Sequence, residues 1–186
     1  MSVLSTSGGF GSLPASGWVS RWLQGCPPGA TLLDWAAGSG RHARAGHAAG
    51  MIVTAIDRDQ AALDRLSDLP VERIVADLER GPWPFADRRF DVVVCTNYLF
   101  RPRLALLAAL VADGGRLVYE TFAAGHERFG RPSNPAFLLR DAELLDVARA
   151  AGLRVLAYEH GERSAPGPAI VQRVCAVRGP GPVPIR

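Results

Sequence analysis

Apolar runs of β-strand length alternate with amphipathic helical segments through the first two thirds of the chain. Strands are expected at 31–35, 51–57, 71–76, 90–97 and 116–122. Helices are expected between most of them, at 41–50, 59–69 and 103–115, whereas Pro82 and Pro84 argue against a helix in 79–89. Apolar strands that alternate with helices are typical of a mostly parallel sheet with helices on both faces.

The last third of the chain has a different pattern. Residues 123–139 hold prolines and glycines with little periodicity, and a loop of that length in a compact domain is usually functional or disordered. A helix over 140–151 is then followed by two strands, 153–160 and 169–178, joined by a turn-rich segment. Such a hairpin would place one antiparallel strand at or near the edge of the sheet.

The beginning of the chain predicts one more helix, over 14–25, in which Trp18 and Trp22 pack against the domain. We therefore expect one domain over 14–180, preceded by a flexible segment over 1–13 and followed by an irregular tail over 181–186.

The composition excludes several chemistries. All 21 basic residues are arginine, so mechanisms that need a lysine are absent, including Schiff bases and Walker-A loops. The net charge of +3 comes without a dense basic cluster that would mark a nucleic-acid surface. The three cysteines, Cys26, Cys95 and Cys175, lie far apart, which predicts core residues and neither a disulfide framework nor a metal site.

Two further features bear on location. No apolar run has the roughly 18–20 residues that a membrane span needs. The first residues lack the basic and apolar regions of a secretory signal, so a cytoplasmic protein is the expectation.

The segment TLLDWAAGSGRHARAG carries the clearest sign of a binding site. A buried strand ends at Asp34, and Gly38 and Gly40 then form a tight turn into a helix. Glycines suit a turn that a ligand approaches closely or that needs positive φ. The same residues, continued to Ala43, also satisfy the GxGxxG/A dinucleotide pattern, which is a weak signal by itself.

Carboxylates close the next two strands as well, at Asp57 and Asp77. Three successive parallel strands thus end in aspartate on the edge of the sheet where such folds bind ligands. Each aspartate alone has an alternative role as a turn or helix cap. An acidic edge nevertheless suits a cofactor with a sulfonium and an ammonium group better than one with a pyrophosphate.

These motifs resemble those of the class I S-adenosylmethionine-dependent methyltransferases. The stretch from Asp34 to Gly40 is similar to their first motif, Asp57 to their ribose-binding acid, and Asp77-Leu78 to their adenine-contacting pair. The segment 84–100 resembles their fourth-strand motif. The resemblance extends from about residue 30 to 178, and small tellurite-resistance-type methyltransferases are the most similar group that we can name.

The chain departs from the family pattern in two places. Ala36 and Ala37 stand where a glycine is common, and the fourth-strand motif reads TNYLF instead of the NPPY form of amino-group methyltransferases.

The resemblance implies a Rossmann-like three-layer α/β/α sandwich whose seven-stranded, mostly parallel sheet has one antiparallel strand. It implies S-adenosylmethionine as cofactor, S-adenosylhomocysteine as product, and no metal. The cofactor-binding residues that it implies are Asp34, Ala36, Gly38, Gly40, Asp57, Arg58, Asp77, Leu78, Thr96, Asn97 and Tyr98.

Methyl transfer from a sulfonium is an in-line displacement, so the protein has mainly to align the reactants and exclude water. A general base is needed only when the nucleophile arrives protonated, and no catalytic residue is evident. Candidates near strand four and the long loop are Tyr98, His126 and Glu127 for catalysis, and Arg101, Phe129 and Arg131 for substrate binding. His126 alternatively is an ordinary surface residue of the loop.

Two other functions remain open at this stage. A NAD(P)-dependent oxidoreductase would share the glycine turn, and a non-catalytic binding or partner protein could retain the fold. The small size favours a small-molecule acceptor, while RNA and protein acceptors also stay open. The sequence does not indicate the acceptor atom, the use of a base or the oligomeric state.

Overall fold

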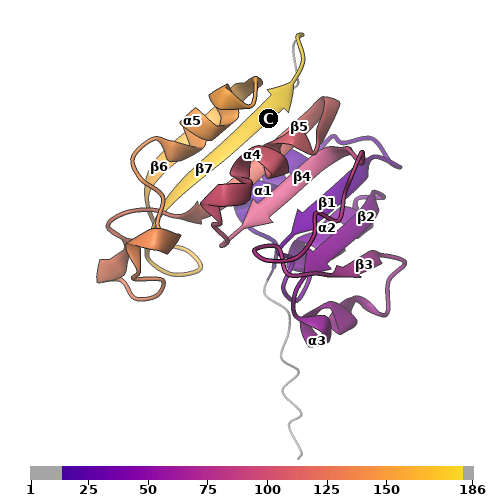
Figure 1. Ribbon diagram of the computed structural model, residues 1–186, viewed down its shortest axis with the longest axis horizontal. Helices are drawn as coiled ribbons and strands as arrows, with labels where there is room; N and C mark the ends of the chain where they lie inside the picture. Colours follow the sequence, from indigo (N-terminus) through magenta and orange to yellow (C-terminus); the bar gives the residue numbers. More distant parts are fainter. Residues whose placement is uncertain (1–13, 182–186) are drawn as a thin grey trace, which may run out of the picture.

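A computed structural model describes residues 14–181, so the predicted flexible segment 1–13 and nearly all of the predicted tail lie outside the described residues. The described chain forms a seven-stranded sheet in the order β3-β2-β1-β4-β5-β7-β6 (Figure 1). Its strands are β1 (Thr31–Trp35), β2 (Ile52–Asp57), β3 (Glu72–Val75), β4 (Phe90–Thr96), β5 (Val111–Phe122), β6 (Leu153–Arg163) and β7 (Ala169–Arg178).

The direction of the strands follows the prediction. Strands β1 to β5 run parallel to one another, and β7 runs antiparallel to both β5 and β6. The reversed strand is therefore next to the edge strand, as the hairpin pattern predicted. Because of this reversal, Arg173 near the start of β7 pairs with Glu120 near the end of β5.

Helices cover both faces of the sheet. One face is covered by α1 (Gly17–Leu23), α2 (Arg41–Ala48) and α3 (Gln60–Leu63), and the other by α4 (Leu104–Ala109) and α5 (Glu143–Ala150). Figure 1 shows α4 in front of the central strands and α5 beside β7 and β6 at the edge of the sheet. This three-layer arrangement is the predicted Rossmann-like sandwich.

Each face has its own apolar core, as expected for strands that are buried on both sides. The α1 face contains Trp18 and Trp22, whose rings meet edge to face at 5.8 Å between centroids, and the buried Cys175. The α5 face contains Cys95 and Tyr119. The predictions that both tryptophans pack against the domain, and that Cys95 and Cys175 are core residues, are confirmed.

Two predicted helices are too long. The one expected over 59–69 covers only Gln60–Leu63, followed by a 3-10 turn over Asp64–Leu66. The helix expected over 103–115 ends at Ala109, and residues from Val111 onward belong to β5. Gly114 has a φ of +78°, and a Cβ on Gly115 would lie 2.9 Å from the carbonyl oxygens of Ala112 and Asp91. Glycine is a poor helix former and here allows a close approach of backbones, which explains the early end of the helix.

The connections also differ in regularity. No helix forms over 79–89, as predicted, and the loop 123–139 contains two short 3-10 turns, His126–Arg128 and Pro135–Phe137. Within residues 14–181, none of the helices has the length and apolar character that crossing a bilayer requires.

Candidate cofactor site

A pocket of about 420 Å³ lies at the carboxyl ends of β1 to β4. This is the edge at which open α/β sheets bind ligands, near the point where the strand order reverses. Its lining residues are Ala36, Asp57, Arg58, Asp77, Leu78, Glu79, Asn97, Tyr98 and Phe137.

The turn after β1 has three residues in the left-handed region. Ala36, Gly38 and Gly40 have φ values of +55°, +54° and +76°. A Cβ on Gly40 would lie 2.5 Å from the side chain of Leu66, which is fully buried, whereas a Cβ on Gly38 would meet nothing within 4 Å. Gly40 is therefore required for both conformation and space, and Gly38 for conformation alone.

Asp57 connects this turn to the end of β2. Its Oδ2 accepts a hydrogen bond of 2.8 Å from the backbone N–H of Gly38, and its Oδ1 accepts one of 2.9 Å from that of Asp59. The carboxylate also lines the pocket. Asp57 thus shapes the turn and also lines the pocket, and its contact with a ligand remains a prediction.

Asp77 acts in a similar way after β3. Its Oδ1 accepts hydrogen bonds from the N–H groups of Glu79 at 2.8 Å and Arg80 at 3.2 Å. The bond from Glu79 is the main reason why the pKa of Asp77 is lower than its ordinary value. An ionised carboxylate is therefore held at this end of the pocket.

Asn97 and Tyr98, which follow β4 in the sequence, form one wall of the pocket. Asn97 has a φ of +53°, and its N–H donates to the carbonyl of Glu120 on β5 at 2.9 Å. The carbonyl of Tyr98 accepts a 2.7 Å bond from the buried Tyr119 hydroxyl. The Tyr98 hydroxyl itself is buried and has no partner among the described residues, and its burial raises its pKa.

Four of the predicted cofactor residues support the pocket without lining it. Asp34 is 1% exposed, and its Oδ2 accepts a 2.9 Å bond from the N–H of Ala43 in the first turn of α2. Gly38 and Gly40 shape the turn, and Thr96 lies 3.4 Å from His42 through its hydroxyl. Their contact with a cofactor remains a prediction.

The structure adds two lining residues that the sequence analysis missed, Glu79 and Phe137. Glu79 follows the Asp77-Leu78 pair directly, so its position was accessible from the motif. Phe137 comes from the 3-10 turn in the loop 123–139 and is 50% exposed. No local signal in the sequence indicates its place beside the pocket.

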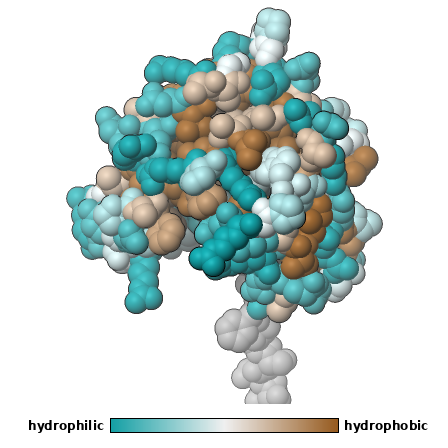
Figure 2. Space-filling model, in the orientation of Figure 1, coloured by the Kyte–Doolittle hydropathy of each residue, from teal (hydrophilic) through white to brown (hydrophobic). Residues whose placement is uncertain are grey.

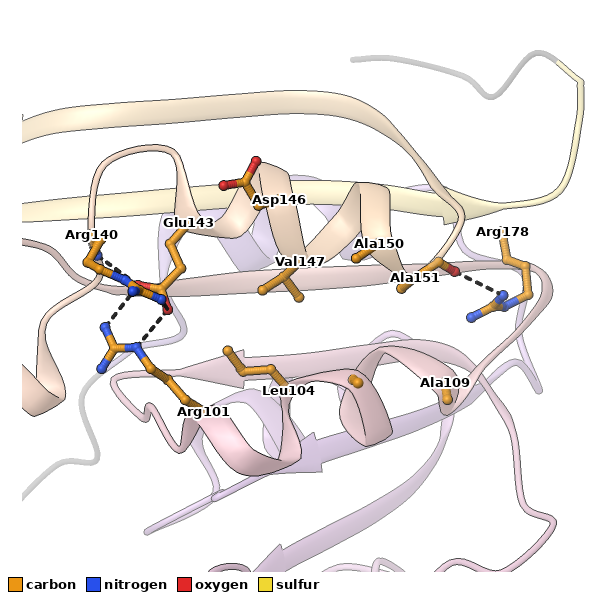
Figure 3. A pocket seen from close by; sticks show the side chains of 11 residues that line it. Arg101, Leu104, Ala109, Arg140, Glu143, Asp146, Val147, Ala150, Ala151 and Arg178 are labelled. Carbon is orange, nitrogen blue, oxygen red and sulfur yellow. Dashed lines mark hydrogen bonds and ion pairs between the residues drawn. The ribbon is translucent and has the colours of Figure 1, made fainter.

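Arg101, a substrate candidate, is engaged with the protein itself. Its Nε and Nη2 bond both oxygens of Glu143 at 2.7 and 2.9 Å (Figure 3). Arg101 also donates to the carbonyls of Ala136 and Leu138, each at 2.7 Å. Burial raises the pKa of Glu143, but the bonds from Arg101 and Arg140 outweigh it and bring the pKa to about 2. This geometry favours a structural role for Arg101.

The other loop candidates are divided between core and surface. His126 is only 4% exposed and stacks on Phe122 with 4.3 Å between ring centroids, so the interpretation as a surface residue is wrong. Its Nε2 lies 3.2 Å from the carbonyl oxygen of Arg131. Glu127, Phe129 and Arg131 are exposed, and none of these candidates lines the pocket at the ends of β1 to β4.

A larger hollow of about 620 Å³ lies between α4 and α5. Figure 3 shows Arg101, Arg140 and Glu143 at one end and Arg178 at the other, with Leu104 and Val147 between them. Figure 2 shows apolar side chains over this strip, surrounded by hydrophilic ones. The groove holds none of the aspartates that end β1 to β3 and is separate from the candidate cofactor site.

The charge of the candidate cofactor site restricts its ligands. Asp57, Asp77 and Glu79 surround the pocket, and Arg58 supplies its one cation among the lining residues. Paired carboxylate oxygens can accept hydrogen bonds from ribose hydroxyls and from an exocyclic amine. A pyrophosphate would instead meet like charge.

The strand order and this site define the class: the chain has the Rossmann-like fold of the class I S-adenosylmethionine-dependent methyltransferases. The model of a methyltransferase domain family matches residues 32–115 of the chain. No curated protein sequence matches the chain.

Solved structures share the fold at low identity. TehB from Haemophilus influenzae superposes with a TM-score of 0.74 at 16% identity, covering 91% of this chain but only 64% of TehB. A TehB-like SAM-dependent methyltransferase from Corynebacterium glutamicum gives 0.64 at 22% identity, covering 88% of this chain and 89% of the other. Magnesium protoporphyrin IX methyltransferase from Synechocystis, solved with bound SAH, gives 0.64 at 19% identity and covers 87% and 80%.

Proposed function

We propose that the protein binds S-adenosylmethionine in the pocket at the ends of β1 to β4 and transfers its methyl group to a small-molecule acceptor. The observation that carries the proposal is the meeting of Asp57, Asp77 and the Ala36–Gly38 turn around one pocket. These groups come from the ends of three successive strands, and each matches a family motif for one part of the cofactor.

In the proposed complex each group has a separate task. The Asp57 carboxylate receives the ribose hydroxyls, and Asp77 with Leu78 receives the adenine. The turn from Ala36 to Gly38 and the wall formed by Asn97 and Tyr98 hold the methionine part. The cofactor supplies an activated methyl group, and the residues of the chain align the acceptor with it and exclude water.

Calorimetric titration with S-adenosylmethionine and S-adenosylhomocysteine tests the proposal. We expect micromolar binding of both, and an at least tenfold loss of affinity in Asp57→Asn. Asp59→Asn is the matched control, because Asp59 caps α3 two residues away and does not line the pocket. No binding by the folded wild-type protein would refute the proposal.

The same protein preparation distinguishes the alternatives. Binding of NAD(P) in place of S-adenosylmethionine would indicate an oxidoreductase, which the three carboxylates around the pocket disfavour. Binding of S-adenosylmethionine without release of S-adenosylhomocysteine on any acceptor of a broad panel would indicate a non-catalytic binding protein.

A further inference from the structure

A cavity of about 390 Å³ lies between the start of α1 and the turn that joins β6 to β7. Three arginines line it, together with Trp18 and Pro166. We call it the arginine cavity and define it by Arg41, Arg163 and Arg173. It shares no lining residue with the candidate cofactor site.

A buried carboxylate holds two of these arginines in place. Glu120 on β5 is fully buried and lies 3.2 Å from Nη1 of Arg163 and 2.7 Å from Nε of Arg173. It also accepts a 3.1 Å bond from the Ser16 hydroxyl. The guanidinium groups are thus fixed by an internal partner, which orders them before any ligand arrives.

The cavity retains an excess of positive charge. Two carboxylates, Glu120 and Glu159, offset part of the positive charge of the three arginines. Glu159 lies 3.1 Å from Arg173 and is half exposed. Nε of Arg163 is buried without an acceptor among the described residues. Burial lowers the pKa of Arg163, Glu120 raises it, and the nearby Arg173 and Arg41 lower it further.

The arginine cavity lies one strand away from the candidate cofactor site. Glu120 is the register partner of Thr96 on β4, and its carbonyl accepts from the N–H of Asn97, which lines the cofactor pocket. His42 strengthens this connection, because its Nε2 accepts from the N–H of Ser16 at 3.3 Å while its Nδ1 lies 3.4 Å from Thr96. A ligand of the cavity would therefore lie beside the end of the cofactor pocket.

We propose that the arginine cavity binds the methyl acceptor through a carboxylate or phosphate group. The proposal rests on the proposed function, because it assigns the cavity to the second substrate. Guanidinium groups bind both kinds of anion through paired hydrogen bonds. The volume is near the lower end for small-molecule pockets, and the Trp18 and Pro166 walls suit an acceptor with one ring.

The test uses small anions and a neutral analogue of the same shape. The full-length protein is saturated with S-adenosylhomocysteine and titrated with benzoate, phenyl phosphate and benzamide. We expect at least one anion to bind about tenfold or more tightly than benzamide, because a charge-assisted hydrogen bond is lost in the neutral compound. The ranking of benzoate and phenyl phosphate distinguishes a carboxylate from a phosphate acceptor.

Two substitutions give effects of opposite sign. Arg163→Gln should weaken anion binding about tenfold or more, since it removes one cation. Glu120→Gln should strengthen it several-fold, since the amide oxygen can still accept a hydrogen bond from the arginines while the negative charge that competes with the ligand is removed. A loss of folding would weaken binding in both variants, so the two signs separate the proposal from a structural effect.

Arg128→Gln is the matched control. Arg128 is 60% exposed in its side chain, pairs with Glu162 at 2.8 Å on β6, and does not line the cavity. Its replacement should change neither anion affinity nor affinity for S-adenosylhomocysteine.

The outcomes separate this proposal from the proposed function. If S-adenosylhomocysteine binds but the anions bind no better than benzamide, or Arg163→Gln leaves anion affinity unchanged, the acceptor site is refuted and the cofactor site stands. If the folded protein does not bind S-adenosylhomocysteine, the proposed function fails, and the assignment of the cavity to an acceptor fails with it even where benzoate binds.

Discussion

Replacing Arg101 by glutamine removes the cation that holds Glu143 and the loop 123–139 together. Glu143 is 7% exposed, and the variant would leave its carboxylate with only Arg140, whose side chain is 77% exposed. Breaking a buried ion pair by removing one partner costs about 3–5 kcal/mol. Because the Arg101 side chain is 29% exposed, we expect a loss of about 2–4 kcal/mol in the free energy of unfolding.

The effect should depend on pH in a defined direction. The folded-state pKa of Glu143 is about 2, below its ordinary 4.5, so the pair contributes stability above pH 4.5 and loses it as the pH falls toward 2. This lowering of the Glu143 pKa corresponds to about 3 kcal/mol in the free energy of unfolding at neutral pH. The gap in stability between wild type and variant should therefore narrow by about 2 kcal/mol between neutral pH and pH ~3.

Urea denaturation followed by circular dichroism at several pH values measures this gap. The control is Arg140→Gln, which removes an exposed partner 3.4 Å from Glu143 and should cost less than about 1 kcal/mol. A loss below about 1 kcal/mol in Arg101→Gln that does not vary with pH would refute the structural role. In that case Arg101 would again be a candidate for substrate binding.

Three further predictions concern the turn after β1 and the thiols. Gly40→Ala should destabilise by about 2–4 kcal/mol, because it combines positive φ with a collision against Leu66, while Gly38→Ala should cost only about 1–2 kcal/mol; equal losses in thermal unfolding would contradict the packing argument. Ala36→Gly should stabilise by roughly 0.5 kcal/mol, since relief of the left-handed strain exceeds the added entropy of the unfolded chain; a lower melting temperature would count against it. In the folded protein a thiol reagent should modify Cys26 first, because Cys95 and Cys175 are buried and burial raises the pKa of Cys175 to about 12; fast reaction of three thiols without denaturant would contradict this.

The sheet could be predicted because its signals are local. Continuous apolar strands, glycine turns and the hairpin near the C-terminus each occupy a few adjacent residues, and the resulting seven-stranded sheet with one antiparallel strand is the expected one. The helix over 103–115 was predicted too long for the same reason. Its apolar residues continue into β5 without a change of character, and Leu110 alone separates the two elements.

Residues of the candidate site could be predicted only where they lie at the end of a strand, because there a short sequence motif indicates their position. Ala36, Asp57, Asp77 and Asn97 follow strands directly, and the structure brings them to one pocket. Phe137 and Glu120 show the limit. Phe137 reaches the pocket from the long loop, and Glu120 meets Arg163 and Arg173 only because β7 reverses. Such contacts depend on the path of the chain in three dimensions, which no short pattern contains.

The reversal of β7 also means that the two candidate sites are built from different parts of the sequence. The candidate cofactor pocket is built mainly by residues 36–98, inside the segment that the family model matches, whereas the arginine cavity is built by residues 14–41 and 163–173, most of which lie outside it. If the arginine cavity binds the methyl acceptor as proposed, substitutions in the β6–β7 turn and at the start of α1 would alter acceptor choice without any change in β1 to β4. Grafting this hairpin between related chains would then transfer specificity.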